Sequence, residues 1–172
     1  TVGNFCSIVS TMDSSNIEFR QRMDALNYML AERRFPHELR ERCRMFYYQS
    51  REQNRIYAYR KLENCFSKSL RSEVAIASNS RWISKVWYLA NITNSGFIAD
   101  VSQLLEPYTA APAEIFEQSF TLFILRRGVA ARNGHVLSCG SVWGEDFVIL
   151  NDDLVDKRYA AALTYTEVLT LQ

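Results

Sequence analysis

Glycine-containing turns in the second half of the chain constrain how its strands can connect. Residues 120–125 form a nearly continuous apolar run that ends before two arginines and Gly128, as expected for a buried strand. Asn133 and Gly134 follow, and this dipeptide accepts the positive φ angles of a tight hairpin turn. The pattern predicts a compact set of short antiparallel strands over residues 120–145.

The same stretch ends in a turn that carries polar groups. Gly140 and Gly144 flank residues 141–143, which are predicted to form a third short strand or a bend, and Glu145 then precedes the apolar residues 147–150. A Gly-Glu pair at this point predicts a short helix whose first N–H groups face an anion. Glu145 is thus a candidate acceptor for a sugar hydroxyl. A solvent-exposed glutamate in an ordinary turn explains the position equally well.

The first half of the chain has helical periodicity instead. Asp13, Pro36 and Ser67 mark helix starts, and residues 50–55 are polar enough to end a helix or form a turn. Six apolar stripes at helical spacing predict six short helices: Phe19, Met23, Leu26 and Leu30; Leu39, Cys43, Phe46 and Tyr47; Leu62 and Phe66; Leu70, Val74 and Ala77; Ile83, Val86, Trp87 and Ala90; and Phe97, Ile98, Val101 and Leu105. Pro107 ends the last helix, and strands begin after Pro112. Helices followed by strands predict an α+β fold with its two parts segregated.

Composition excludes several classes of function. A net charge of +1 gives no argument for nucleic-acid binding. Four well-separated cysteines and two histidines argue against a metal site, and they indicate free thiols in a reducing cytosol. No apolar run approaches the roughly 20 residues that a membrane span needs. No nucleophile–base pair, phosphate-cradling glycine loop or paired carboxylates occur at a useful spacing, so we do not expect an enzyme.

Several separated segments resemble the cytosolic part of the cyclic-nucleotide-gated, hyperpolarisation-activated and ether-à-go-go cation channels. Residues 1–19 are similar to the end of the pore-lining helix and the first helix of the C-linker in that family. Residues 28–42 resemble the second linker helix and residues 70–74 the fourth. Residues 122–145 are similar to the cyclic-nucleotide-binding β-roll. The order of the segments matches the family over nearly the whole chain.

This resemblance implies a domain layout and a ligand site. Residues 1–12 correspond to the pore helix end, residues 13–92 to a linker of about six short helices, and residues 93–172 to the roll. The roll is expected to be antiparallel and jelly-roll-like, with a short phosphate-cassette-type helix. The family's closing helices are absent after Gln172, and the roll is shorter than the family's near Gln118 and Asp152, through a real deletion or through residues missing from the sequence. The residues placed at the ligand are Gly144, Glu145, Asp146, Phe147, Arg158 and Tyr159.

The departures from the family bear on the ligand. Members that bind cyclic nucleotide carry an Arg-Thr/Ser-Ala triplet whose arginine pairs with the cyclic phosphate. Counting back from a predicted strand over residues 162–165 places Asp156 and Lys157 at the first two of these positions, and an aspartate there repels phosphate. Arg158 replaces the arginine only if the strand slips or bulges; otherwise it is a surface arginine. Cyclic AMP or cyclic GMP is therefore a doubtful ligand, and no other cofactor is expected.

The resemblance also implies partners and a location. We expect a homotetramer or heterotetramer joined through the linker helices, tethered to its own transmembrane pore domain at the cytoplasmic face of a membrane. The strand at 162–165 resembles the ether-à-go-go branch, which favours a potassium-type, voltage-gated channel. Arginines at positions 33, 34, 40, 42 and 44 either contact anionic lipid or form a solvated helix face with neighbouring glutamates.

Two other classes remain as alternatives. A soluble cyclic-nucleotide receptor, such as a kinase regulatory subunit or a transcription regulator, shares the roll but lacks the helical preamble and the pore-end residues. A cupin-type enzyme also has a similar roll, but it needs a histidine-rich metal set that His135 alone does not supply.

Overall fold

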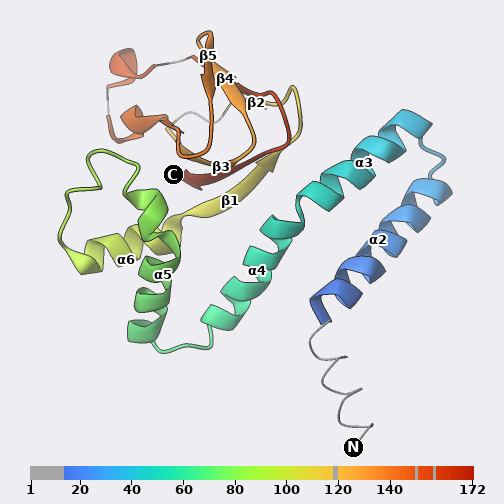
Figure 1. Ribbon diagram of the computed structural model, residues 1–172, viewed down its shortest axis with the longest axis horizontal. Coiled ribbons are helices and arrows are strands. Elements are labelled where there is room, and N and C mark those ends of the chain that lie inside the picture. Colours follow the sequence, from blue (N-terminus) through green and yellow to red (C-terminus); the bar gives the residue numbers. More distant parts are fainter. Residues whose placement is uncertain (1–13, 118–119, 150, 157) are drawn as a thin grey trace, which may run out of the picture. The chain divides into compact units, whose positions relative to one another are not determined.

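The computed structural model describes residues 14–117, 120–149, 151–156 and 158–172. The predicted end of a pore helix at residues 1–12 lies outside the described residues. The chain divides into two compact units, residues 1–55 and residues 56–172. Helices precede antiparallel strands, which confirms the predicted α+β class (Figure 1).

A helical hairpin makes up most of the first unit. Helix α2 (Ser14–Glu32) is followed by a short turn and by α3 (His37–Gln49), and the two helices pack against each other. Phe19 stacks on Tyr47 with ring centroids 5.3 Å apart, and Leu30 is fully buried. The first two predicted stripes therefore mark real helices. They supply the contact between α2 and α3 because residues three or four apart share a helix face.

The next helix differs from the prediction. Helix α3 ends at Gln49, as one of the two predictions for residues 50–55 had it. Helix α4 (Arg51–Glu63) begins directly afterwards and is continuous, so the other prediction, a turn over residues 50–55, and the separate short helix around Leu62 and Phe66 are wrong. Only Ser50 separates α3 from α4, and the Asn54 N–H already donates to the Ser50 carbonyl, 3.0 Å away. The polar residues after Ser50 include arginine, glutamate and glutamine, which are good helix formers. Polarity alone was therefore a poor signal for a turn.

Helices α5 (Lys68–Ile83) and α6 (Ser95–Leu104) begin at side-chain caps. Ser67 Oγ accepts from the Leu70 N–H at 3.4 Å, and Asn94 Oδ1 accepts from the Phe97 N–H at 3.1 Å. The helix predicted over residues 83–90 is wrong. Consecutive turns occupy this region, closed by bonds between residues three apart, and they still bury Val86 and Leu89. The described residues thus form five α-helices instead of the six predicted.

The strands form two four-stranded antiparallel sheets. One sheet has the order β1 (Glu106–Ala110), β8 (Thr166–Leu171), β3 (Leu122–Arg127), β6 (Val142–Trp143). The other has the order β2 (Ile115–Phe116), β7 (Ala160–Ala162), β4 (Ala130–Arg132), β5 (His135–Leu137). Asn133 and Gly134 have φ angles of 52° and 77°, which confirms the predicted hairpin turn.

Strand structure starts earlier than predicted. Pro107 lies inside β1 instead of ending a helix, and β1 is an edge strand, where a missing N–H is tolerated. A second difference follows β7, which ends at Ala162. Residues 163–165 form a bend that leads from one sheet to the other, so the strand predicted over residues 162–165 is wrong.

Strand β3 is buried on both faces, as its apolar run predicts. Leu122 and Ile124 belong to a core that also includes residues of α5, α6 and the turns between them. Phe123 and Leu125 point to the opposite face and join a core that contains residues of both sheets. Helices α5 and α6 therefore cover one face of the β1–β8–β3–β6 sheet, while the other sheet packs against its opposite face.

Candidate functional site

A pocket of about 290 Å³ lies where the two sheets meet the segment after β6. We call it the β-pocket. Five of the six residues predicted at a ligand line it: Gly144, Asp146, Phe147, Arg158 and Tyr159. They come from the 3₁₀ helix η1 (Glu145–Val148), the residue before it, and the segment that leads into β7. The sixth residue, Glu145, does not line the pocket, and ligand binding by the other five stays a prediction.

Three aromatic rings line the apolar side of the β-pocket. Phe123 and Trp143, paired across β3 and β6, are stacked with centroids 5.2 Å apart and 8° between their planes. Phe116 from the other sheet meets both rings edge-on, with centroids 5.4 Å away from each. Small residues on β4 and β7 share this core, among them Ala130 and Ala160, and they leave room for the rings. This arrangement gives the pocket a rigid apolar wall.

An ion-pair cluster forms the polar side of the β-pocket. The Asp156 carboxylate accepts two bonds from Arg158, at 2.7 Å from Nε and 2.8 Å from an Nη atom. Arg132 approaches the same carboxylate at 3.1 Å, and its Nε also donates to the Arg158 carbonyl at 3.2 Å. Asp156 thus bridges two arginines. Paired bonds of this kind are the geometry with which arginine also holds phosphate.

The two arginines favour the ionised form of the Asp156 carboxyl group. The bonds from Arg158, together with the charges of both arginines, lower the pKa of Asp156 to about 2. The same contact raises the pKa of Arg158. Asp156 is therefore an anion at every physiological pH, and it occupies the arginine donors that a phosphate would need.

The pH dependence of stability should report this pairing. Because the pKa of Asp156 is lower in the folded protein than its ordinary 3.8, the pairing stabilises the fold above that value. The contribution is then lost as the pH falls through about 2. In urea denaturation, the difference in unfolding free energy between wild type and Asp156→Asn should be constant above about pH 5 and shrink toward pH 2. A difference that grows on acidification would contradict this assignment.

Gly144 and Asp146 fix the turn at the edge of the β-pocket. Gly144 has a φ of 74°, and a Cβ placed on it would lie 2.1 Å from the Thr121 carbonyl oxygen, so only glycine fits. The Asp146 carboxylate accepts a hydrogen bond from the Asp156 backbone N–H. This bond ties η1 to the segment that carries the ion-pair cluster.

Glu145 is not among the residues that line the β-pocket. It lies near Tyr88, in the turns between α5 and α6, and its negative charge helps to raise the pKa of the Tyr88 phenol, after the larger effect of burial. Burial, with a smaller contribution from Asp146, raises the pKa of Glu145 itself. The predicted role of Glu145 as a ribose acceptor therefore has no support from its position.

Arg158 reaches the β-pocket without the strand slip that the sequence required. Strand β7 begins only at Ala160, so strand alternation does not decide which way Arg158 points. Lys157, predicted at the position of the family's hydroxyl residue, lies outside the described residues. Sequence reasoning missed Arg132, which it assigned only to a hairpin connector. Its pairing with Ala160 across β4 and β7 brings it beside Arg158, and this register is not visible in the sequence.

Part of this chain is similar in sequence to a known protein. A cyclic nucleotide-gated cation channel protein of Drosophila melanogaster is 24% identical over 159 residues, which cover 86% of this chain. The chain is similar to part of a channel. The match spans 24% of the length of that protein, and no family model matches the chain. The similarity covers most of this chain, so it includes both helical and β parts.

Two further features are absent from the described part of the chain. None of the helices in this part is long and apolar enough to cross a membrane. Within the same residues, no group of three or more histidine, cysteine or acidic side chains is arranged to hold a metal ion.

Proposed function

We propose that the chain is a non-enzymatic gating module of a tetrameric cation channel of the potassium type, located at the cytoplasmic face of a membrane. In this proposal the helical part connects the β part to the pore gate. A conformational change in the β part then shifts the equilibrium between the open and closed pore, through a coupling free energy between the β part and the gate. The observation that supports the proposal most directly is the similarity to a channel protein, which extends over both parts.

The β-pocket supports a restricted role for cyclic nucleotide. It combines an aromatic wall with two arginines, which suits a purine and a phosphate. Asp156 already pairs with both arginines and places a negative charge beside them. We therefore propose that the wild-type chain binds cyclic AMP and cyclic GMP weakly or not at all. Gating in this proposal therefore follows movement of the β part without a requirement for nucleotide.

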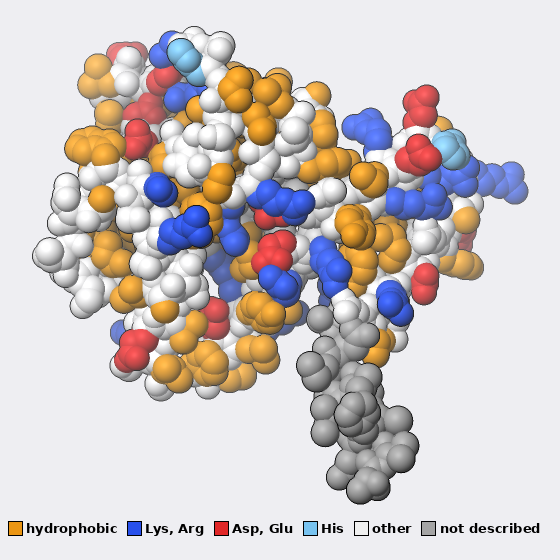
Figure 2. Space-filling model, in the orientation of Figure 1, with side chains coloured by type: hydrophobic (Ala, Val, Ile, Leu, Met, Phe, Trp, Pro, Cys, Tyr) orange, Lys and Arg blue, Asp and Glu red, His pale blue; other side chains and the backbone are white. Residues whose placement is uncertain are grey.

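The surface of the α2–α3 hairpin supports self-association. Tyr28 is 72% exposed and Tyr48 57% exposed, and hydrophobic side chains lie between charged ones on the face shown in Figure 2. A two-helix hairpin has little interior of its own and gains stability by docking its apolar surface. We propose that this surface packs against other copies of the chain. Exposed arginines at the end of the hairpin, including Arg33 and Arg34, are available for anionic lipid.

Sedimentation equilibrium tests the association. We expect the chain to form tetramers at high protein concentration, and Tyr28→Glu to weaken them about tenfold or more, because a charge would enter an apolar contact. Val136→Glu is the matched control, since Val136 is 69% exposed on β5, outside the hairpin, and should leave association unchanged. Only monomer at the highest concentration, or an equal effect of both variants, would count against the proposed interface.

Patch-clamp recording of the full-length protein tests the function. We expect a cation current in cells that express it, and a shift in activation when residues 106–172 are deleted. A full-length protein that reaches the membrane but carries no current, with or without this deletion, would overturn the proposal.

A further inference from the structure

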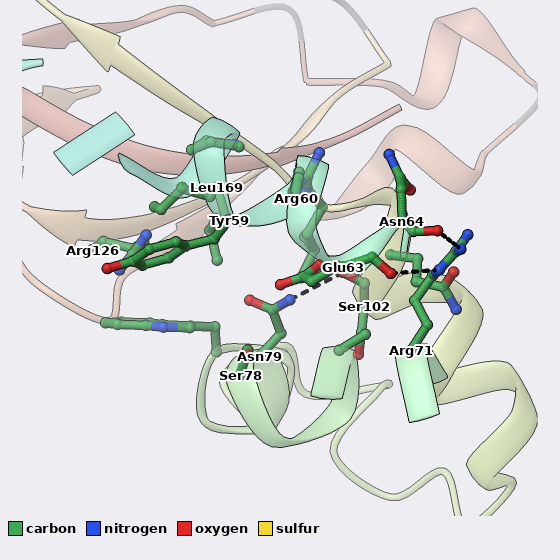
Figure 3. A pocket seen from close by; sticks show the side chains of 16 residues that line it. Tyr59, Arg60, Glu63, Asn64, Arg71, Ser78, Asn79, Ser102, Arg126 and Leu169 are labelled. Atoms are coloured by element: carbon green, nitrogen blue, oxygen red, sulfur yellow. Dashed lines mark hydrogen bonds between the residues drawn. The ribbon is translucent and has the colours of Figure 1, made fainter. Parts of the chain in front are cut away.

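A second pocket, of about 360 Å³, lies between the helices and the sheet that carries β3. We call it the helix–sheet pocket. Its walls include Tyr59 and Arg60 of α4, Arg71 of α5, Ser102 of α6 and Arg126 of β3 (Figure 3). All of these residues belong to the second unit of the chain. The pocket shares no lining residue with the β-pocket.

Positive charge dominates this pocket. The lining residues include three arginines and a single acid, Glu63. Figure 3 shows Arg126 at one end of the pocket and Arg71 at the other, with Arg60 and Glu63 between them. Several guanidinium groups around one partly open pocket create an attractive potential for an anion, because the surrounding protein screens charge less than water does.

Two of the three arginines have partners of their own. Arg71 donates to the carbonyls of Glu63 and Asn64, at 3.2 and 2.9 Å, and so caps the carboxyl end of α4. Arg60 donates to the Leu105 carbonyl. These bonds go to uncharged carbonyl groups and hold both side chains in place. Arg60 also forms a long ion pair with Glu106, at 3.9 Å.

Arg126 is different. Its Nε atom is buried and has no hydrogen-bond partner among the described residues, and its guanidinium lies 5.6 Å from the centre of the Trp82 ring. A buried donor without an acceptor costs free energy, because it has lost its water and gained nothing in return. The ring contact holds the guanidinium beside Trp82 but accepts no hydrogen bond. Arg126 lines the pocket, so an anionic oxygen there would pair with its guanidinium charge, and a change of side-chain rotamer would give Nε the acceptor that it lacks.

We propose that the helix–sheet pocket binds a phosphate monoester, either a phosphorylated small molecule or a phosphorylated lipid headgroup. A phosphate monoester carries up to two negative charges and three strong acceptor oxygens, whereas a carboxylate carries one charge and two oxygens. The larger charge suits a pocket with three arginines and one acid. Its volume is near the lower end of the range for small-molecule sites, which limits the ligand to about the size of a mononucleotide.

Calorimetric titration of the chain with AMP tests the site, with adenosine as the matched probe that lacks phosphate. We expect AMP to bind and adenosine not to bind. Arg126→Gln should weaken AMP binding about tenfold or more, because it removes a charged donor. Arg127→Gln is the matched control: Arg127 is the next residue on β3, but it is exposed and pairs with Glu167 at 3.3 Å, so its loss should change AMP binding by less than about twofold.

Further arms separate the source of the phosphate and the location of the site. Vesicles of phosphatidylcholine with and without phosphatidylinositol phosphate replace AMP in the same titration. If the chain binds the phosphorylated vesicles but not AMP, and Arg126→Gln removes this binding, the ligand is a lipid headgroup. If the chain binds AMP but not the vesicles, the ligand is a free phosphate monoester. Arg158→Gln, in the β-pocket, should leave either kind of binding unchanged.

A measurement on the wild-type chain avoids dependence on the variants. The Nε–H resonance of Arg126 should shift on addition of AMP, or of the phosphorylated vesicles, and not with adenosine. No shift and no binding with any phosphate probe would overturn the proposal. An equal loss in Arg126→Gln and Arg127→Gln, or a loss only in Arg158→Gln, would overturn it as well. None of these outcomes depends on the proposed channel role.

Discussion

Asp156→Asn is expected to raise the affinity of the chain for cyclic AMP at least about tenfold, which corresponds to about 1.4 kcal/mol. The substitution removes a negative charge from the polar side of the β-pocket and releases Arg158 and Arg132, which Asp156 holds at 2.7 and 3.1 Å. Repulsion between unit charges 4 Å apart amounts to about 4 kcal/mol near a protein surface, so tenfold is a lower bound. Isothermal titration calorimetry with cyclic AMP and cyclic GMP measures the change.

Two variants make this test specific. Asp153→Asn removes the same charge from an exposed neighbour outside the β-pocket lining, and it should leave the affinity at the wild-type value. Adding Arg158→Gln to Asp156→Asn should abolish the gain if Arg158 is the group that meets phosphate. An Asp156→Asn protein with no gain would show that Asp156 is not the obstacle. Micromolar affinity of the wild type for either nucleotide would contradict the proposal that the chain binds cyclic nucleotide weakly or not at all.

Gly144→Ala is expected to destabilise the second unit by about 3 kcal/mol or more. Two costs combine here. An alanine pays about 1–2 kcal/mol for the left-handed backbone conformation, and its Cβ would meet the Thr121 carbonyl oxygen at 2.1 Å. Because the obstacle is backbone of the segment that leads into β3, relief requires η1 or the start of β3 to move. Urea denaturation followed by tryptophan fluorescence measures the loss, since Trp143 adjoins the site.

Gly134→Ala separates these two costs. Gly134 has a φ of 77°, close to the 74° of Gly144, but a Cβ on Gly134 would meet no atom within 4 Å. The destabilisation by Gly134→Ala should therefore be limited to the backbone cost of about 1–2 kcal/mol. Equal destabilisation by the two variants would show that the Thr121 carbonyl moves aside freely.

The parts of the fold that were predictable depended on local signals. Each of three features can be recognised from a few neighbouring residues: the buried apolar run of β3, the Asn133-Gly134 turn and the Ser67 cap. The errors arose where spacing was ambiguous. Residues 83–90 bury side chains at helix-like intervals while the backbone forms a series of turns, and the apolar period does not distinguish these two cases.

The candidate site was predictable only in part, for a related reason. Gly144 and Asp146 belong to a local turn that the sequence predicts, and both line the β-pocket. The position of Arg132 beside Arg158 depends on the pairing of β4 with β7, which joins residues far apart in the chain. Glu145 lies near Tyr88 and not at the pocket, and this position depends on packing against a segment more than fifty residues earlier in the chain. Local pattern carries no information about either contact.

Strand β3 has a consequence for how the second unit opens. Its alternate side chains belong to separate cores, so neither core can come apart while the other keeps β3 in place. Amide protons along the middle of β3 should therefore exchange with solvent only through complete unfolding of residues 56–172. The helices and the sheets of this unit would then lose their structure in one cooperative step, in spite of their different architecture.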